Sequence, residues 1–162
     1  MYKFFNNGVP ENRDATIGGY DYITKNIGDK LYTINISRPH EEDNPKMMNL
    51  WTSCGFGFLL VFAINDKTSF DLIKSTRESI LKEKHGKECP IILVGNKQDL
   101  AHNREVSYDD AKQLADSWNI EYIETSVNTN FNCIEPFDHL AVKIYESRLL
   151  KKNKSTCPCS IY

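Results

Sequence analysis

The stretch IILVGNKQDL, residues 91–100, decides the fold of this chain. Four apolar residues lead into Gly95 and then into the polar run NKQD, residues 96–99. A short apolar run without alternating polar residues predicts a parallel strand that is buried on both faces. Ligands of parallel sheets bind outside the carboxyl ends of the strands. The polar run therefore lies where a ligand is expected.

Strands and helices are predicted to alternate along the rest of the chain, which indicates an α/β fold with a mostly parallel sheet and helices on both faces, in three layers. Residues 21–37 are typical of two strands joined at residues 27–30, and residues 57–65 of another strand covered on both faces. Further strands are expected at residues 90–96 and 120–126, and helices at residues 66–84, 107–118 and 132–152.

Local signals support these helices. Phe70, Ile73 and Ile80 share one face of the first helix. Ser107 precedes the second as an N-cap. Pro136 falls near the first turn of the third, where its missing N–H costs little, and this long helix is predicted to be amphipathic.

Composition limits the class of protein. The chain has 162 residues, room for one domain with a core, and a net charge of −2, so no overall field favours nucleic acid as a partner. No apolar run reaches the roughly 18 residues of a spanning helix. The first residues, MYKFFNNG, lack the apolar region of a secretory signal. We therefore expect the chain in the cytosol or nucleus, with reduced thiols.

The polar run NKQD suits the recognition of guanine. Asp99 offers two acceptor oxygens for the neighbouring N1–H and 2-amino donors of guanine, a pair that adenine lacks. Asn96 can either contact the base or tie neighbouring loops together, and the stem of Lys97 can lie along the flat face of the base. A polar turn that only ends the strand is the alternative.

A second polar segment follows the next predicted strand, in IETSVNT at residues 123–129. The backbone N–H groups around Ser126 and Val127 are placed to meet the carbonyl oxygen of the same base. Two polar loops on neighbouring strand ends form a pocket.

Several segments together resemble the Ras family of small GTPases, in the Ras/Rap branch. They are GFGFLLVFAINDKTSFDLI, IILVGNKQDL and YIETS, with RDATIGGY similar to the first switch and effector segment. The resemblance implies a Ras-like guanine-nucleotide-binding domain over residues 1–150 and a basic, cysteine-containing tail over residues 151–162. It also implies a monomeric signalling switch that binds GTP or GDP with magnesium.

The resemblance assigns roles to single positions. Asn96, Lys97 and Asp99 match the guanine-reading motif, and Ser126 and Val127 match the second base loop. The first switch supplies further positions. Thr16 is assigned to magnesium and the γ-phosphate, and Asp14, Thr16 and Ile17 are assigned to the region that meets effector and regulator proteins.

The chain departs from the family where phosphate is handled. It contains no G-x-x-x-x-G-K-[ST] loop, whose backbone N–H groups cradle the phosphates. In the segment SRPHE, Ser37 replaces the magnesium aspartate, His40 a glycine, and Glu41 the glutamine that orients the attacking water. Asn128 stands where the family usually has a lysine beside the base. We expect GTP hydrolysis to be impaired or absent.

The family's first strand, which lies between the strands expected at residues 31–37 and 58–65, is not present in this sequence, and we expect an N-terminally truncated domain. Burial of about five aliphatic side chains, at about 2 kcal/mol each, is lost with it. Either the flanking strands close up, or the gene product begins upstream; the second is favoured.

The chain ends in KKNKSTCPCSIY. Cys159, four residues from the end, has the layout of a prenylation box, and Cys157 is placed for a second acyl chain beside basic residues. We expect lipid anchoring at the cytoplasmic face of the plasma membrane or an endomembrane; a tail with incidental cysteines is the alternative. The alternatives for the whole chain are a pseudo-GTPase interaction module and a truncated product without nucleotide binding.

Overall fold

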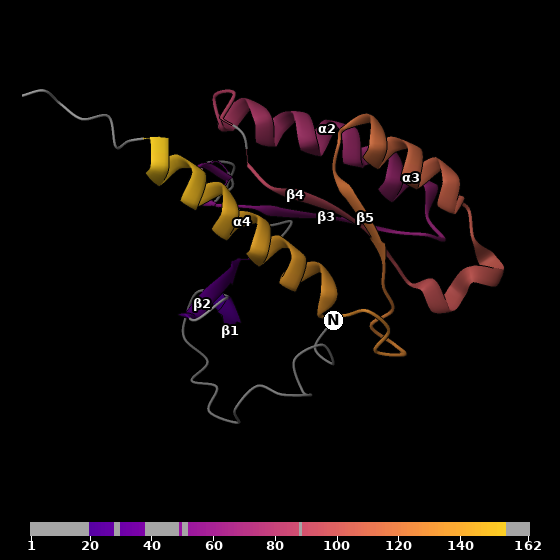
Figure 1. Cartoon of the computed structure of the whole chain (residues 1–162). Coiled ribbons are helices and arrows are strands. Elements are labelled where there is room, and N and C mark those ends of the chain that lie inside the picture. Colours follow the sequence, from indigo (N-terminus) through magenta and orange to yellow (C-terminus); the bar gives the residue numbers. More distant parts are fainter. Residues whose placement is uncertain (1–19, 28–29, 38–48, 50–51, 88, 155–162) are drawn as a thin grey trace, which may run out of the picture.

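The computed structural model describes residues 20–27, 30–37, 49, 52–87 and 89–154. In chain order (Figure 1), its elements are β1 (Tyr20–Ile27), β2 (Lys30–Ser37), β3 (Phe58–Ala63), α2 (Lys67–Glu83), β4 (Ile91–Asn96), the 3-10 helix η2 (Gln98–Asn103), α3 (Tyr108–Ser117), β5 (Glu121–Glu124) and α4 (Glu135–Lys154).

The described strands form two sheets. β1 and β2 pair in antiparallel fashion, with Tyr20 opposite Ser37, and β3, β4 and β5 form a parallel sheet with β4 in the centre. The predicted α/β fold with a parallel sheet is therefore confirmed. The predicted hairpin forms too, and its turn at residues 28–29 lies outside the described residues.

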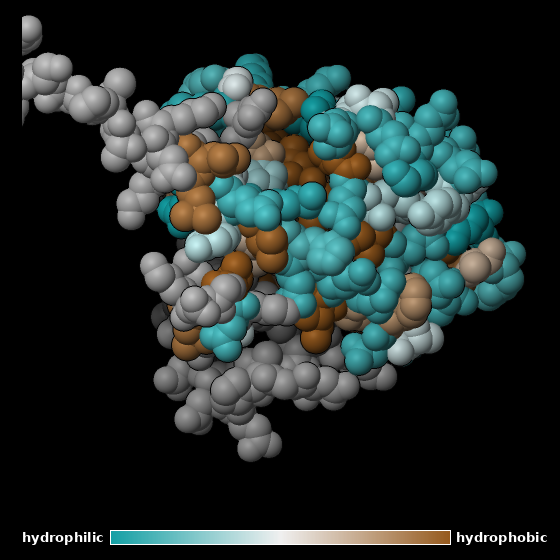
Figure 2. Space-filling view, in the orientation of Figure 1, coloured by the Kyte–Doolittle hydropathy of each residue, from teal (hydrophilic) through white to brown (hydrophobic). Residues whose placement is uncertain are grey.

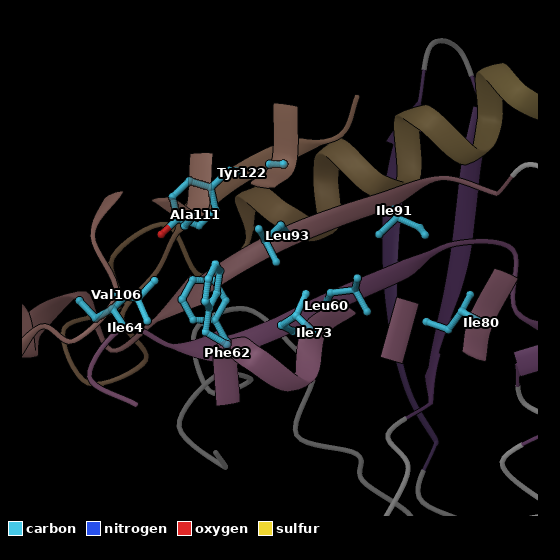
Figure 3. Close-up of a cluster of buried hydrophobic side chains, with 12 residues drawn as sticks. Leu60, Phe62, Ile64, Ile73, Ile80, Ile91, Leu93, Val106, Ala111 and Tyr122 are labelled. Atoms are coloured by element: carbon cyan, nitrogen blue, oxygen red, sulfur yellow. The ribbon is translucent and has the colours of Figure 1, made fainter. Parts of the chain in front are cut away.

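Burial of β4 on both faces organises the core. Ile91 and Leu93 enter one apolar cluster, whereas Ile92 and Val94 enter another on the opposite face. This alternation explains the unbroken apolar run in the sequence, because each face of a central parallel strand meets its own layer. Figure 3 shows side chains of the first cluster converging from neighbouring elements.

Helices cover both faces of the parallel sheet (Figure 1): α2 and α3 lie on one face and α4 on the other. Phe70, Ile73 and Ile80 of α2 are buried in the first cluster, as predicted. Leu140 of α4 is buried in the second cluster, and Ile144 packs against it.

Side-chain caps fix where α2 and α3 begin. Asp66 accepts a hydrogen bond from the N–H of Ser69 at 3.1 Å, and Ser107 accepts one from the N–H of Asp110 at 3.0 Å. Each satisfies an N–H that a helix leaves without a partner in its first turn. The N-cap predicted at Ser107 is confirmed.

The prediction that residues 57–65 form a strand covered on both faces is wrong at one position. Leu60 and Phe62 are buried, but Val61 keeps 52% of its surface exposed. Among the described strands, β3 pairs with β4 alone, and Leu59 but not Val61 packs against the cluster that contains Leu140 of α4. Within the described residues, β3 pairs with β4 and β2 pairs with β1, so the two strands have not closed up on each other.

The prediction that the last helix is amphipathic is also wrong. Apolar residues lie all around α4: Leu140 and Ala141 are buried, while Val142, Leu149 and Leu150 are exposed. Figure 2 shows apolar surface among the polar side chains on the side of the molecule that carries α4. The helix continues to Lys154, past the domain boundary predicted after residue 150, and that boundary stays a prediction.

Gly95 of β4 leaves room for the large side chain of Tyr122 on the neighbouring strand β5. A Cβ atom at this position would fall far inside contact distance of the Tyr122 hydroxyl and 3.1 Å from Ile64 Cγ2. Tyr122 is buried, and its hydroxyl donates a 2.8 Å hydrogen bond to Glu124, so it cannot swing away without losing that bond. Only glycine fits between the strand and this side chain.

We expect Gly95→Ala to lower the free energy of unfolding by about 1–3 kcal/mol, because an added methyl group overpacks the core. Urea denaturation of Gly95→Ala, Tyr122→Phe and the double variant measures the effect. In the double variant, loss of the hydroxyl makes room for the methyl group, so the two costs should be less than additive. Fully additive costs would contradict this explanation.

Candidate functional site

The parallel register brings the two predicted polar loops to one edge of the sheet. Gly95 lies opposite Glu124, and the ladder continues past the strand ends through two hydrogen bonds. The N–H of Thr125 donates to the carbonyl of Gly95 at 2.9 Å, and the N–H of Gln98 donates to the carbonyl of Thr125 at 3.0 Å. The segments after β4 and β5 are therefore joined through their backbones.

Asn96 ties the two loops together. Its Oδ1 accepts a hydrogen bond from the hydroxyl of Thr125 at 3.3 Å, and its carbonyl accepts one from the N–H of Ile64 at 2.9 Å. The side-chain contact matches one of the two roles predicted for Asn96, that of a loop tie.

Lys97 turns the chain from β4 into η2. Its backbone is left-handed, with φ of 67° and ψ of 37°, and its side chain is exposed. This conformation is uncommon for a residue with a Cβ, and it places Asp99 on the first turn of η2. The 3-10 helix itself is not predicted from the sequence.

The carboxylate of Asp99 meets the loop that follows β5. Its Oδ1 accepts a 2.6 Å hydrogen bond from the hydroxyl of Ser126, and its Oδ2 accepts a 3.2 Å bond from the side-chain amide of Asn128. The hydrogen bond from Ser126 lowers the pKa of Asp99; burial opposes this shift and Asn128 assists it. Asp99 therefore stays ionised and able to accept hydrogen bonds from a ligand.

The Ser126 N–H does not match its predicted role. Ser126 is fully buried, and its N–H donates to the carbonyl of Phe131 at 2.9 Å, so this group is not available to a base. Within the part of the chain that the structure describes, the N–H of Val127 has no protein partner. Of the two predicted N–H groups, the one on Val127 remains open to a ligand.

A partly buried ion pair supports this edge of the sheet, and the sequence did not predict it. Arg104 donates to both carboxylate oxygens of Glu124, at 2.7 and 2.9 Å, and to the carbonyl of Val106 at 3.2 Å. Tyr122 donates to the same carboxylate. The partners lie 20 residues apart, so no local pattern could have revealed them.

The ion pair holds the last residue of β5, directly before the loop that contacts Asp99. Burial alone would raise the pKa of Glu124, but the hydrogen bonds from Arg104 and Tyr122 outweigh it, and the pKa lies below its ordinary value. The Glu124 side chain is only 12% exposed, so solvent screens the pair weakly.

We expect Glu124→Gln to lower the free energy of unfolding at neutral pH by about 2–3 kcal/mol, because Arg104 loses its charged partner. Since folding depresses the pKa of Glu124, its contribution is present above the unfolded-state pKa and is lost as the pH falls through the folded-state pKa. Urea denaturation at several pH values should show this acid-induced loss in the original chain and a smaller one in the variant.

The matched control is Asp116→Asn, which breaks the exposed Lys112–Asp116 pair on α3. Exposed pairs of this spacing contribute about 0.3–0.5 kcal/mol. Equal costs for the two variants would contradict a special role for the Arg104–Glu124 pair.

Other predicted residues cannot be placed. Those outside the described residues are Asp14, Thr16, Ile17, His40, Glu41, Cys157 and Cys159. Ser37 is the last residue of β2, and only its backbone is described.

Across the described ranges, no group of three or more His, Cys, Asp or Glu side chains is arranged to hold a metal ion. None of the described helices is long and apolar enough to span a membrane.

A surface cleft of about 360 Å³ lies beside the candidate site, along β5. Gln98, Tyr122 and Glu124 are among the residues that line it, but Asn96 and Asp99 are not. The cleft therefore borders the two loops, through Gln98 and Asn132 among others, but does not include Asp99, and we do not assign the ligand to it.

The family model and the relatives that match this chain agree on one protein family. The family model described as "Ras family" matches residues 1–146. The chain is 34% identical over 132 residues to the Ras-like protein rasZ of Dictyostelium discoideum, which covers 80% of this chain and 62% of that protein.

Two further relatives are the Ras-related proteins R-Ras of Mus musculus and Homo sapiens. They are 36% and 35% identical to the chain over 129 residues, covering 74% of this chain and 59% of each relative. The chain thus spans about three fifths of the length of these relatives.

Proposed function

Because this chain belongs to the Ras family of small GTPases, we propose that it is a membrane-anchored signalling switch that binds guanine nucleotide at the loops after β4 and β5 and hydrolyses GTP poorly or not at all. The contact between Asp99 and Ser126 supports this proposal most directly, since it joins the two loops in one site. A carboxylate turned into the core, or far from Ser126, would have left no shared site for a base.

In the proposed complex, Asp99 reads the two neighbouring donors of guanine. Asn96 holds the loops together, the stem of Lys97 covers the face of the base, and the N–H of Val127 donates to its carbonyl oxygen. Adenine would leave the carboxylate without its donors, and sites built around such polar groups reject ligands that cannot satisfy them.

The phosphates are the weak part of the proposed complex. The sequence contains no G-x-x-x-x-G-K-[ST] loop, and charge-assisted hydrogen bonds of that kind contribute about 1.5–3 kcal/mol each. Thr16 and Ser37 are the residues proposed to reach magnesium, and Glu41 takes the position that orients water. A carboxylate at Glu41 would repel the γ-phosphate, which is why we propose impaired hydrolysis.

Effector and regulator proteins are the proposed macromolecular partners, through Asp14, Thr16 and Ile17. A second candidate function is a protein-interaction module that works without nucleotide. The departures from the family in the segment SRPHE, where Ser37, His40 and Glu41 replace residues that handle magnesium and phosphate, favour it. The two functions differ in whether the chain binds GDP.

Titration with fluorescent GDP and fluorescent ADP tests the base-reading role. We expect GDP to bind more weakly than about 1 µM because the phosphate contacts are missing, yet in preference to ADP. Asp99→Asn should reduce this preference by about tenfold or more, since it removes a charged acceptor. Asp116→Asn, an exposed carboxylate on α3, is the control and should leave the preference unchanged.

Three results would contradict parts of the proposal. Micromolar or tighter binding of GDP would mean that the missing phosphate loop matters less than we propose. An unchanged preference in Asp99→Asn would remove the role of Asp99, and undetectable GDP binding would favour the nucleotide-independent module.

Membrane anchoring is proposed for Cys159, with Cys157 as a second lipid site. One lipid chain gives only marginal membrane binding, so two signals are expected to act together. In cell fractionation, Cys159→Ser should move the protein from membranes to the soluble fraction, and Cys157→Ser should do so in part. Continued membrane binding of Cys159→Ser would contradict the anchor.

A further inference from the structure

Asn128 contacts the same carboxylate that is proposed to read the base. Its side-chain amide donates to Asp99 Oδ2 at 3.2 Å, while the hydroxyl of Ser126 holds Oδ1 at 2.6 Å. Both oxygens of Asp99 therefore already accept hydrogen bonds from the chain. Each carboxylate oxygen can accept two hydrogen bonds, so a ligand that donates to both oxygens finds one acceptor position already taken on each.

The two partners of Asp99 differ in how firmly they are held. Ser126 is fully buried, its hydroxyl also accepts the N–H of Thr129 at 3.2 Å, and its backbone forms a two-bond bridge with Phe131. Asn128 is exposed, and within the described residues its amide has one hydrogen bond, to Asp99. Ser126 is thus a fixed part of the site, whereas Asn128 can be displaced into water.

The loop that carries Asn128 is a closed structure. The Ser126–Phe131 bridge closes its ends, and Asn130 and Asn132 adopt left-handed conformations with φ of 60° and 50°. Asn132 also donates to the carbonyl of Glu124 at 3.3 Å. The loop backbone therefore keeps Asn128 next to Asp99, while the exposed Asn128 side chain can turn away.

An asparagine amide and the donor-bearing edge of guanine offer the same chemistry to a carboxylate, an N–H group of an amide-like nitrogen. We propose that Asn128 is a specificity-determining residue: in the nucleotide-free chain its amide takes the acceptor position on Asp99 Oδ2 that guanine uses, so that guanine displaces it on binding. This inference rests on the proposed function, because it concerns regulation of the same site.

Displacement of Asn128 has a direct consequence for selectivity. Guanine donates its own hydrogen bonds to Asp99 in place of the one from Asn128. The free-energy cost of breaking the Asn128 contact therefore lowers its affinity only in part. Adenine has no donor pair to offer and leaves the contact between Asn128 and Asp99 intact. Removing the Asn128 amide should therefore strengthen the binding of guanine nucleotides and leave adenine nucleotides unchanged.

The test compares the full chain with Asn128→Ala, and with Thr129→Ala as the matched control. Thr129 is the next residue of the loop, and its backbone contact with Ser126 survives the substitution. Titration with fluorescent GDP should give roughly threefold to tenfold tighter binding for Asn128→Ala, with no change for Thr129→Ala. Fluorescent ADP should bind all three proteins equally.

A second measurement reports on the contact without any ligand. Since the Asn128 hydrogen bond helps to lower the pKa of Asp99, carbon-13 NMR titration should show a higher pKa in Asn128→Ala than in the original chain. An unchanged pKa would mean that the contact is absent in solution, and would overturn the inference.

The binding outcomes separate this inference from the proposed function. If GDP binds the original chain and Asn128→Ala binds it equally or more weakly, Asn128 is not a competitor, and only this inference fails. If none of the three proteins binds GDP although the pKa of Asp99 rises in Asn128→Ala, the proposed function fails, and the competition fails with it.

Discussion

β4 carries apolar side chains on both faces, and it can be buried only between two layers of helices with a parallel strand on each side. Ile92 and Val94 face α4, whereas Ile91 and Leu93 face α2 and α3. Once β3 and β5 pair with it in parallel register, the carboxyl ends of β4 and β5 must lie at one edge of the sheet. Asp99 and Ser126 meet there because of that register.

The carboxylates of Glu124 and Asp99, both near the end of β5, are stabilised in different ways. The difference indicates a structural role for Glu124 and a ligand-binding role for Asp99. Glu124 is paired with Arg104 through two hydrogen bonds in a partly buried position, so its charge is neutralised within the fold. Among the described residues, the side chains that donate to Asp99 are the neutral groups of Ser126 and Asn128. No cation of the described residues forms an ion pair with its carboxylate, which can still attract the donors of a ligand.

The parallel register of β4 and β5 also connects the packing around Gly95 and Tyr122 with the candidate site at Asp99. Gly95 lets Tyr122 pack against β4, Tyr122 bonds Glu124, and Glu124 directly precedes the loop that holds Asp99. The position of the base-reading carboxylate thus depends on close packing behind it. Sites built on strand ends gain precision in this way, because a rigid sheet fixes the loops that leave it.

Local patterns predicted what depends on neighbouring residues along the chain. The apolar run at residues 91–94 identified β4, the spacing of Phe70, Ile73 and Ile80 identified the buried face of α2, and Ser107 identified the start of α3. The polar residues after each strand indicated Asp99 and Ser126 as members of one site, because parallel strands end at the same edge. These inferences need only periodicity, capping and the geometry of parallel sheets.

The tertiary structure decided what depends on distant partners. The exposure of Val61 follows from the position of β3 at the edge of the sheet, and the exposed apolar residues of α4 follow from which of its sides meets the core. The Arg104–Glu124 pair and the contact of Asn128 with Asp99 join residues 20 and 29 positions apart. The sequence therefore determined which side chains are offered to the site, and only the packed chain determined which of them are already engaged, since that depends on distances that no local pattern records.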